Sequence, residues 1–176
     1  MNQAGARAKR NAAGFGFAAN HDKLAIQRIS TGAAYMTIAA ILHGRTGAVI
    51  AARKDDTVRA VVDLLAQHRI GAVPVMEGDA IVGIFSERDM VRLMSSYGPE
   101  ALDRQLDEVM TKSPVTCEPS TAVMAALSQM TQKRIRHLPV VDGGRLIGFV
   151  SIGDLVKYRI DRIEAEAAAM RDYIAS

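Results

Sequence analysis

The sequence predicts a mixed α/β fold of the α+β kind, in which two β-α-β-β-α units pack with pseudo-two-fold symmetry. Three observations support this prediction: a duplication at a constant offset of 65 residues, a helical apolar stripe in each copy, and paired short strands after each stripe. A unit of about 60 residues buries too little surface to be firmly stable alone, so two copies are expected to share one structure.

The duplication covers the apolar runs and the polar residues that follow them. In the first copy Ile70-Gly71-Ala72-Val73-Pro74-Val75 precedes Gly83-Ile84-Phe85-Ser86-Glu87-Arg88-Asp89. In the second copy Ile135-Arg136-His137-Leu138-Pro139-Val140 precedes Gly148-Phe149-Val150-Ser151-Ile152-Gly153-Asp154. Each copy therefore ends in the same polar pair, a Ser followed three residues later by an Asp.

The first helix of each copy is predicted from apolar residues at i, i+3, i+4 and i+7. They are Val58, Val61, Val62 and Leu65 in the first copy and Val123, Ala126, Leu127 and Met130 in the second. Short apolar runs at 72–76 and 80–85, and at 138–141 and 145–150, flank Gly-containing turns and predict β-hairpins. A second helix is expected at 87–96 and at 152–165.

A polar stretch at 100–109 is expected to be helical, as is the segment from Leu155 to Ile174. An apolar stripe marks the second of these segments, and its spacing predicts docking on the partner repeat or on another subunit. The stripe consists of Ile160, Ile163, Ala167, Met170 and Ile174. We therefore divide the chain into a flexible basic extension (1–35), two repeats (36–98 and 99–165) and the end of a C-terminal helix (166–176).

Charge separates the extension from the repeats. Residues 1–35 hold five basic side chains against one acidic, whereas the remaining residues hold 17 basic and 18 acidic side chains. The balanced repeats argue against a nucleic-acid surface. For the extension, a flexible tail, a transit peptide, a nucleic-acid-binding arm and a true start at Met36 all remain open; its lack of an apolar core argues against a secretory signal.

The composition also argues against several classes of function. The single cysteine, Cys117, allows no internal disulfide and suits a reducing compartment, so a cytoplasmic location is expected. No apolar stretch is long enough to span a bilayer. Four scattered histidines predict no metal site, and the lack of a nucleophile–base set or a phosphate-binding loop of the Walker type predicts that the protein is not an enzyme.

The motif order resembles the CBS domain, the cystathionine-β-synthase-type module that occurs in tandem as a Bateman module. The resemblance covers about residues 36–162 and is closest to stand-alone bacterial CBS pairs related to the regulatory insert of inosine-monophosphate dehydrogenase. It implies a regulatory module that binds an adenine nucleotide between the repeats, AMP first, with NAD(H) or ATP as alternatives, and no catalytic cofactor. It also implies a homodimer that signals to an unidentified protein partner.

The Ser–Asp pair itself has two interpretations. A Ser before a helix and an Asp at its third residue form a capping box that satisfies free backbone N–H groups. The same geometry suits a nucleotide, because the helix N-terminus and the hydroxyl attract a phosphate while the carboxylate accepts hydrogen bonds from a ribose diol. The family resemblance favours the ligand; a structural dimerisation module with purely capping pairs, or one associated with nucleic acid, is the alternative.

The second copy is predicted to carry the principal nucleotide site. Arg136-His137 replaces Gly71-Ala72 there, and adds a permanent cation and a titratable ring. The resemblance implies that backbone groups of the segment leading into each repeat bind adenine. The principal site is predicted to consist of Ser151, Asp154, Arg136, His137, Thr116, Cys117, Ile135, Pro139 and Arg88. A second, weaker site is predicted from Ser86, Asp89, Thr57, Ile50 and Ala51.

Overall fold

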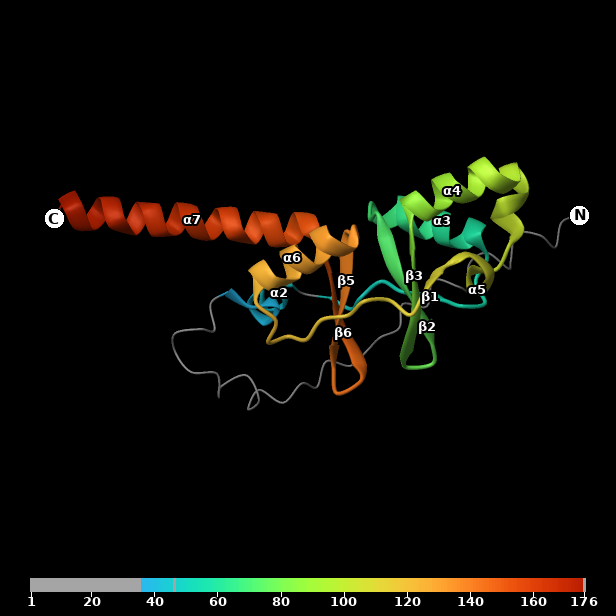
Figure 1. The fold of residues 1–176 in the computed structure, drawn as a ribbon, viewed down its shortest axis with the longest axis horizontal. Helices are drawn as coiled ribbons and strands as arrows, with labels where there is room; N and C mark the ends of the chain where they lie inside the picture. Colours follow the sequence, from blue (N-terminus) through green and yellow to red (C-terminus); the bar gives the residue numbers. More distant parts are fainter. Residues whose placement is uncertain (1–35, 46, 176) are drawn as a thin grey trace, which may run out of the picture.

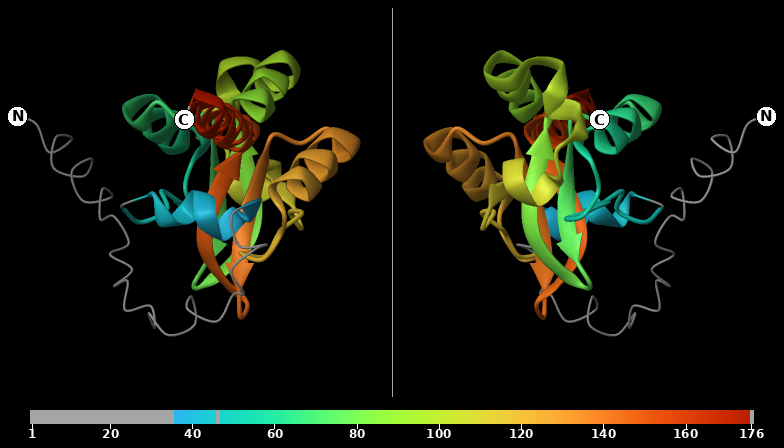
Figure 2. Two further views of the ribbon diagram at one scale, coloured as in Figure 1. Left: turned by 90° about the vertical axis from the view of Figure 1, so that its left-hand side faces the viewer. Right: turned by 90° about the vertical axis from the view of Figure 1, so that its right-hand side faces the viewer.

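The computed structural model describes residues 36–45 and 47–175. The predicted extension, residues 1–35, lies outside the described residues. The described chain is a mixed α+β structure in which the two predicted hairpins lie side by side, with β3 next to β6 (Figures 1 and 2). The predicted fold class is therefore confirmed.

The two units repeat the same order of elements. The first unit contains β1 (Ala52–Arg53), α3 (Val58–His68), β2 (Ala72–Glu77), β3 (Ala80–Ser86) and α4 (Glu87–Tyr97). The second contains α6 (Val123–Lys133), β5 (His137–Asp142), β6 (Arg145–Ser151) and α7 (Ile152–Ala175). Cys117 takes the place of β1 in the second unit through an isolated parallel bridge to Val140, as Ala52 pairs with Val75 in the first.

The hairpins keep the 65-residue offset down to their irregularities. Ala72 pairs with Ser86 and His137 with Ser151 at the open ends. The register shifts after Val75 in one hairpin and after Val140 in the other. A bulge bends its strand and increases the local twist, so the duplication preserved the shape of each hairpin as well as its pairing.

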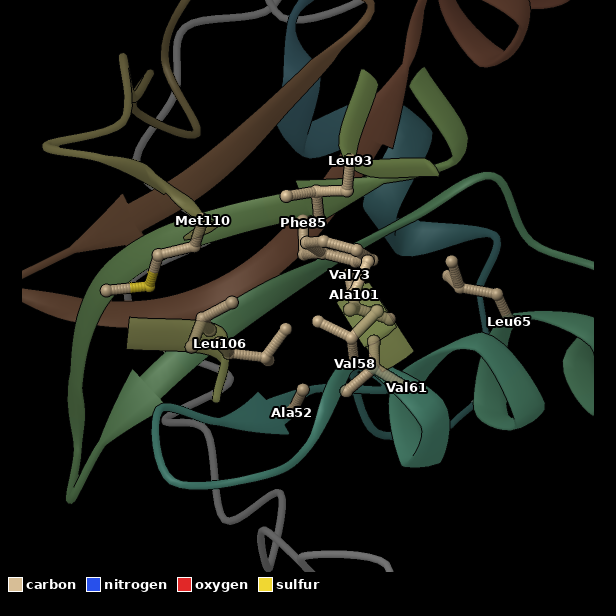
Figure 3. Packing of buried hydrophobic residues seen from close by; sticks show 11 residues of the cluster. Ala52, Val58, Val61, Leu65, Val73, Phe85, Leu93, Ala101, Leu106 and Met110 are labelled. Atoms are coloured by element: carbon tan, nitrogen blue, oxygen red, sulfur yellow. The ribbon is translucent and has the colours of Figure 1, made fainter. Parts of the chain in front are cut away.

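Each unit is preceded in sequence by a leading helix: α2 (Ile38–His43) before the first and α5 (Leu106–Val109) before the second. The leading helices exchange partners. Ile38 and Ile41 are buried in the core of the second unit, whereas Leu106 and Met110 are buried in the core of the first (Figure 3). Because each core contains a helix from the other side of the chain, neither unit can open without exposing apolar surface of both.

Two glycines accept the exchanged helices. A Cβ at Gly148 would lie 2.6 Å from Leu42 Cδ2, and a Cβ at Gly83 would lie within 3.0 Å of Met110 Cγ and the Thr111 carbonyl oxygen. The duplicated glycine is thus a packing requirement, since any side chain there would collide with the neighbouring segment.

The connection between the units departs from its predicted helix. The stretch predicted as helical at 100–109 forms a 3-10 helix, η2 (Gly98–Asp103), followed by the short α5 and by β4 (Thr111–Lys112). Strand β4 pairs with β3 and completes a four-stranded sheet, β1-β2-β3-β4, whereas β5 and β6 form a two-stranded sheet. Leu106 lies within the polar stretch but is fully buried in the first core, so the stretch does not form one continuous exposed helix.

Helix α7 confirms the helix predicted from Leu155 to Ile174, but only its first turns dock on the chain's own body. Leu155 is fully buried, whereas Ile163 is 49% and Met170 64% exposed. The remainder of the helix extends away from the body as a single rod (Figure 1). The sequence predicted that the apolar stripe docks either on the partner repeat or on another subunit. For these exposed outer turns, docking on the partner repeat of the same chain is wrong.

Candidate functional site: a cleft between the units

Both Ser–Asp pairs form complete capping boxes. In the first unit Ser86 Oγ accepts from the Asp89 backbone N–H at 3.4 Å, and Asp89 Oδ2 accepts from the Ser86 N–H and hydroxyl at 3.0 and 2.6 Å. In the second unit Ser151 Oγ accepts from the Asp154 N–H at 3.2 Å, and Asp154 Oδ2 accepts from the Ser151 N–H and hydroxyl at 2.6 and 2.7 Å. The capping role is therefore real, yet it occupies only one oxygen of each carboxylate and leaves Oδ1 for another partner.

A cavity of about 570 Å³, here called the cleft cavity, lies between the units. Ser151 and Asp154 line it from the N-terminus of α7, together with His137 and residues 147–149. The first unit contributes residues 69–72 and its leading segment, with Leu42, Arg45 and residues 47–50. A volume of this size lies in the range of small-molecule sites, and the walls combine aliphatic side chains with a few converging polar groups.

Asp154 is the most strongly engaged polar group of the cleft cavity. Its Oδ1 forms an ion pair with Nη2 of Arg45, and Arg45 Nη1 also donates to the carbonyl oxygen of Phe149 at 2.9 Å. Partial burial acts to raise the pKa of the Asp154 carboxyl, but the Ser151 hydrogen bonds and the Arg45 guanidinium outweigh it and hold that pKa below its usual value. The carboxylate is therefore ionised at neutral pH.

His137 stacks on Phe149 with ring centroids 5.4 Å apart and planes 5° from parallel. Burial lowers the pKa of His137, while the Asp154 and Glu87 carboxylates act in the opposite direction and Arg136 and Arg88 add to the lowering. The ring is thus neutral at pH 7. The cavity is lined both by the cationic Arg45 and Arg69 and by this stacked pair of rings, so it offers groups for an anion and for a planar ring.

The structure groups the predicted site residues differently from the sequence. Ser151, Asp154 and His137 meet at the cleft cavity, but the leading segment that faces them is that of the first unit. Ile50, assigned from sequence to the weaker site, therefore lines the same cavity as Asp154. The exchange of leading helices explains the difference, because it carries each leading segment across the pseudo-two-fold axis.

The other residues predicted for the principal site lie elsewhere among the described residues. Cys117 and Pro139 are buried side by side, with the Cys117 N–H donating to the Pro139 carbonyl oxygen at 3.0 Å. Ile135 packs against the second core, and Thr116 and Arg136 are exposed. Arg88 Nη1 donates to the Arg134 carbonyl oxygen at 3.1 Å, which ties the start of α4 to the end of α6.

Of the residues predicted for the weaker site, Ile50 lines the cleft cavity and the others lie elsewhere. Asp89 Oδ1 lies 4.0 Å from Nη1 of Arg92, whose side chain is 72% exposed. Thr57 is the N-cap of α3 and accepts from the Ala60 N–H at 3.3 Å. In the second unit Thr121 instead accepts from the Glu118 N–H at 3.0 Å, and the N-cap of α6 is Ala122, which makes no side-chain cap hydrogen bond. Ala51 precedes β1.

Arg45, Arg69, Phe149 and Gly71 belong to the cavity but were not predicted for it. Arg69 carries a signal in the sequence, since Arg134 repeats it at the 65-residue offset. The structure places both residues at the ends of α3 and α6 in the left-handed conformation, with φ of 53° and 54°. Arg45 carries none, because its neighbours in sequence do not reveal which Asp it will face.

The cysteine and the histidines form no reactive centre in the part of the chain that the structure describes. Burial raises the pKa of the Cys117 thiol to about 11, so the nucleophilic thiolate is scarce at neutral pH. No group of three or more potential metal-ligating side chains comes together in residues 36–45 and 47–175. Within the same residues, no helix is both long and apolar enough to cross a membrane.

The family model of the CBS domain matches residues 45–96 and 106–161. The chain is 36% identical over 125 residues to the mitochondrial CBS domain-containing protein CBSX3 of Arabidopsis thaliana, covering 68% of this chain and 61% of that protein. It is 39% identical over 111 residues to inosine-5'-monophosphate dehydrogenase of Mycobacterium tuberculosis, covering 61% of this chain but only 20% of the enzyme. The chain thus spans less than two thirds of either relative.

Solved structures show the same architecture. The CBS-domain containing protein ATU1752 of Agrobacterium tumefaciens has a TM-score of 0.69 and 32% identity, with 74% of this chain and 98% of that chain covered. CBSX2 in complex with AMP has a TM-score of 0.60 at 24% identity, with coverage of 72% and 97%. The CBS pair of MJ0100 in complex with 5-methylthioadenosine and S-adenosyl-L-methionine has 0.63 at 21%, with coverage of 72% and 97%.

Proposed function

Because this chain belongs to the CBS-domain family, we propose that it is a regulatory module that binds an adenine nucleotide in the cleft cavity. One observation carries the proposal: the first leading segment brings cationic Arg45 against the ionised Asp154 at the N-terminus of α7, in a cavity that Arg69 also lines. CBSX2 with AMP and MJ0100 with adenosyl ligands have the same fold, which supports an adenosine-type ligand for this chain as well.

AMP is the preferred candidate within this class, with NAD(H) and ATP as alternatives. A ribose diol can donate to Asp154 Oδ1, and a phosphate suits the helix N-terminus and the two guanidinium groups. The aliphatic wall formed by Ile50, Ile70 and Ile147, together with the His137–Phe149 stack, can take the base. With one carboxylate against two guanidinium groups, the cavity favours an anionic ligand over the sulfonium of S-adenosylmethionine.

Calorimetry and thermal denaturation with AMP, ADP, ATP, NAD, NADH, adenosine and S-adenosylmethionine test this proposal. A ligand at one hundred times its dissociation constant stabilises the folded state by about 2.7 kcal/mol. AMP is expected to bind most tightly, and S-adenosylmethionine more weakly than AMP. If none of these compounds binds or stabilises the protein, the proposal is rejected.

Regulation without catalysis is the role we propose, in the cytoplasm, where a lone thiol stays reduced. Occupation of the cleft cavity would couple to the packing of the two units, because each leading segment belongs to both cores. An unidentified partner protein would then bind one of the two states more tightly, and the ligand's differential affinity for the states sets the size of the effect. The protein is proposed to act as a homodimer.

A purely structural dimerisation module is the second candidate function. The complete capping boxes favour it, because they give both Ser–Asp pairs a role without any ligand. It predicts self-association that no adenine compound alters and an empty binding panel. Dimerisation together with nucleotide binding would exclude it.

A further inference from the structure

The segments that lead into the two units differ in length. Leu42 and Met110 are equivalent, since each packs on the duplicated glycine, and Ala52 and Cys117 are equivalent in strand pairing. Ten positions separate Leu42 from Ala52, but only seven separate Met110 from Cys117. The first leading segment therefore has three additional residues, and Arg45 lies in this longer stretch.

Arg45 bridges the cleft cavity in a way that has no counterpart at Asp89. One guanidinium nitrogen is paired with Asp154 Oδ1 and another donates to the Phe149 carbonyl oxygen at 2.9 Å, so the group is held at two points. With Ser151 on Oδ2, both oxygens of Asp154 are occupied. Among the described residues, the corresponding oxygen of Asp89 is paired with the exposed Arg92 alone, at 4.0 Å.

The proposed ribose-binding oxygen is thus already occupied by a cation of the same chain. A nucleoside that uses Asp154 has to displace Arg45 and leaves its charge without a partner. A ligand with a phosphate offers the displaced guanidinium a new anion within the same cavity, and charge-assisted, bidentate pairing suits arginine.

We propose that Arg45 is a specificity-determining residue of the cleft cavity, which yields Asp154 to ligands that bring a phosphate and excludes nucleosides that do not. This inference rests on the proposed nucleotide site. The ligand class is narrowed to adenosine phosphates, including dinucleotides, as opposed to adenosine or 5-methylthioadenosine.

Calorimetric titration of AMP and of adenosine into the full chain tests the role of Arg45. In Arg45→Ala we expect adenosine to bind about tenfold more tightly and AMP about tenfold more weakly, so that the preference for AMP falls about a hundredfold. Arg45→Lys keeps the charge but not the two-point geometry, and an intermediate preference is expected. Arg92→Ala, which removes the arginine beside Asp89, is the matched control and is expected to leave the preference unchanged.

Two outcomes would overturn the inference while leaving the proposed function standing. Arg45→Ala could weaken both ligands equally, which would make Arg45 an ordinary contact, or it could change neither. Failure of the unaltered protein to bind either ligand would instead reject the nucleotide site itself. Arg45 has 41% of its side chain exposed, so its replacement is expected to leave the fold intact, and thermal denaturation of each variant checks this.

Helix α7 carries a second inference on independent observations. Val156, Ile160, Ile163, Ala167, Met170 and Ile174 follow one another at alternating intervals of four and three residues. This is the seven-residue repeat of a coiled coil, in which these residues occupy the a and d positions. The large members of the stripe are 44–79% exposed, so this seam is open to a partner.

The flanking charges select that partner. In a parallel, in-register pair of helices, each g residue faces the e residue five positions later on the other helix. Arg159 then faces Glu164, and Glu166 faces Arg171, so both positions bring opposite charges together. Arg159 already lies 3.8 Å from Met36 at the body, which leaves the outer pair, Glu166 with Arg171, as the cleaner probe.

We infer that two copies of this chain associate through α7 as a short, parallel, two-stranded coiled coil. The seam covers fewer than three heptads and includes an alanine, so the association is expected to be reversible in the micromolar range. The charge pattern favours a second copy over an unrelated helix, because it is complementary to itself.

Sedimentation equilibrium of charge-reversed variants tests the pairing and its direction. Glu166→Lys alone and Arg171→Glu alone are each expected to weaken the dimer about threefold to tenfold, because each places like charges opposite one another. The double variant restores both ion pairs between copies and is expected to recover the dimer. Residues five apart do not face each other within one helix, so this rescue reports contacts between chains.

A cysteine at the d position 170 provides the matching readout of direction. In a parallel pair, Met170→Cys places the two thiols opposite each other and is expected to give an oxidised dimer on gentle oxidation. Three outcomes would each overturn the inference. The protein could be entirely monomeric, the double variant could dimerise no better than the single variants, or Met170→Cys could fail to cross-link.

Discussion

The two units share one sequence pattern but offer their aspartates different surroundings. Asp89 and Asp154 both cap a helix through Oδ2 with nearly the same distances. Asp154 faces a cavity and an arginine from the first leading segment, whereas Asp89 is paired, among the residues that the structure describes, with an exposed arginine on its own helix. Duplication thus preserved the capping, while the three additional residues of one leading segment made the two aspartates unequal.

Replacing each aspartate by alanine is the most direct test of the difference between the two units. Asp154→Ala is expected to weaken AMP binding by about tenfold to a hundredfold, because it removes the charged acceptor of the cleft cavity. Asp89→Ala removes an identical cap, and both variants are expected to lose on the order of 1 kcal/mol of stability. The measurement is calorimetry for binding together with urea denaturation for stability.

Equal losses of AMP binding in the two aspartate variants would contradict the assignment of the ligand to the cleft cavity. Similar losses of stability with unequal losses of binding would support it, because both variants remove a capping carboxylate while only Asp154→Ala removes a group of the cavity and the partner of Arg45.

Substituting each duplicated glycine by alanine tests how rigidly the exchanged segment beside it is held. Gly83→Ala is expected to cost about 2–3 kcal/mol, because the added methyl meets the Thr111 carbonyl oxygen of a paired strand. At Gly148→Ala the three nearest atoms all belong to the flexible Leu42 side chain, so the variant is expected to cost about 1 kcal/mol. Urea denaturation of the two variants measures the difference.

Leu42→Ala should rescue Gly148→Ala, since it removes the colliding methyl groups. A Gly148→Ala variant that is as costly as Gly83→Ala, and is not rescued in this way, would show that the leading segment cannot move at either glycine.

The second unit has a titratable residue, His137, where the first unit has Ala72, so the stability of the second unit is expected to depend on pH. Burial lowers the pKa of His137, so below about 6.5 the unfolded chain binds a proton that the folded chain resists. The free energy of unfolding is therefore expected to fall as the pH drops from about 6.5 toward the lower pKa of the folded state. His137→Gln should remove this part of the pH dependence, an effect smaller than either glycine substitution.

Thermal denaturation between pH 5 and 7.5 measures the stability of the parent protein and of His137→Gln. An identical pH dependence in the parent and in His137→Gln would show that His137 is not the group that titrates. Stability that rises on acidification would contradict the direction of the pKa shift.

The smallest effect is expected where Cys117 stands in the place of Ala52. Its raised pKa, about 11, and its burial predict alkylation by iodoacetamide at pH 8 that is much slower than for an exposed thiol and that speeds up on unfolding. Cys117→Ala restores the residue of the first unit and is expected to cost about 1 kcal/mol or less. Rapid alkylation of the native protein would show that the second leading segment opens easily.

Elements built from local interactions could be predicted from the sequence. The hairpins, the helices after them and both capping boxes depend on hydrogen bonds between residues close along the chain, and periodicity and spacing encode these. The 3-10 helix at Gly98–Asp103 was missed because Ala101 and Leu106 follow the demands of the first core rather than a helical period.

The residues predicted for the principal site are only partly brought together by the structure. Ser151, Asp154 and His137 were identified from the duplication and from its exceptions, and the cleft cavity brings them together. Arg45 could not be found in this way, since the contact with Asp154 joins positions 109 residues apart that no local pattern connects.

The sequence by itself thus determined two repeated units, their hairpins and a capped helix N-terminus in each. Only the tertiary structure decided that the leading helices exchange partners, and that Arg45 therefore reaches Asp154 while no arginine of the described part of the second leading segment pairs with Asp89. The physical reason is that capping and strand pairing are short-range, whereas the choice of core for α2 and α5 depends on which apolar surface they bury best across the pseudo-two-fold axis.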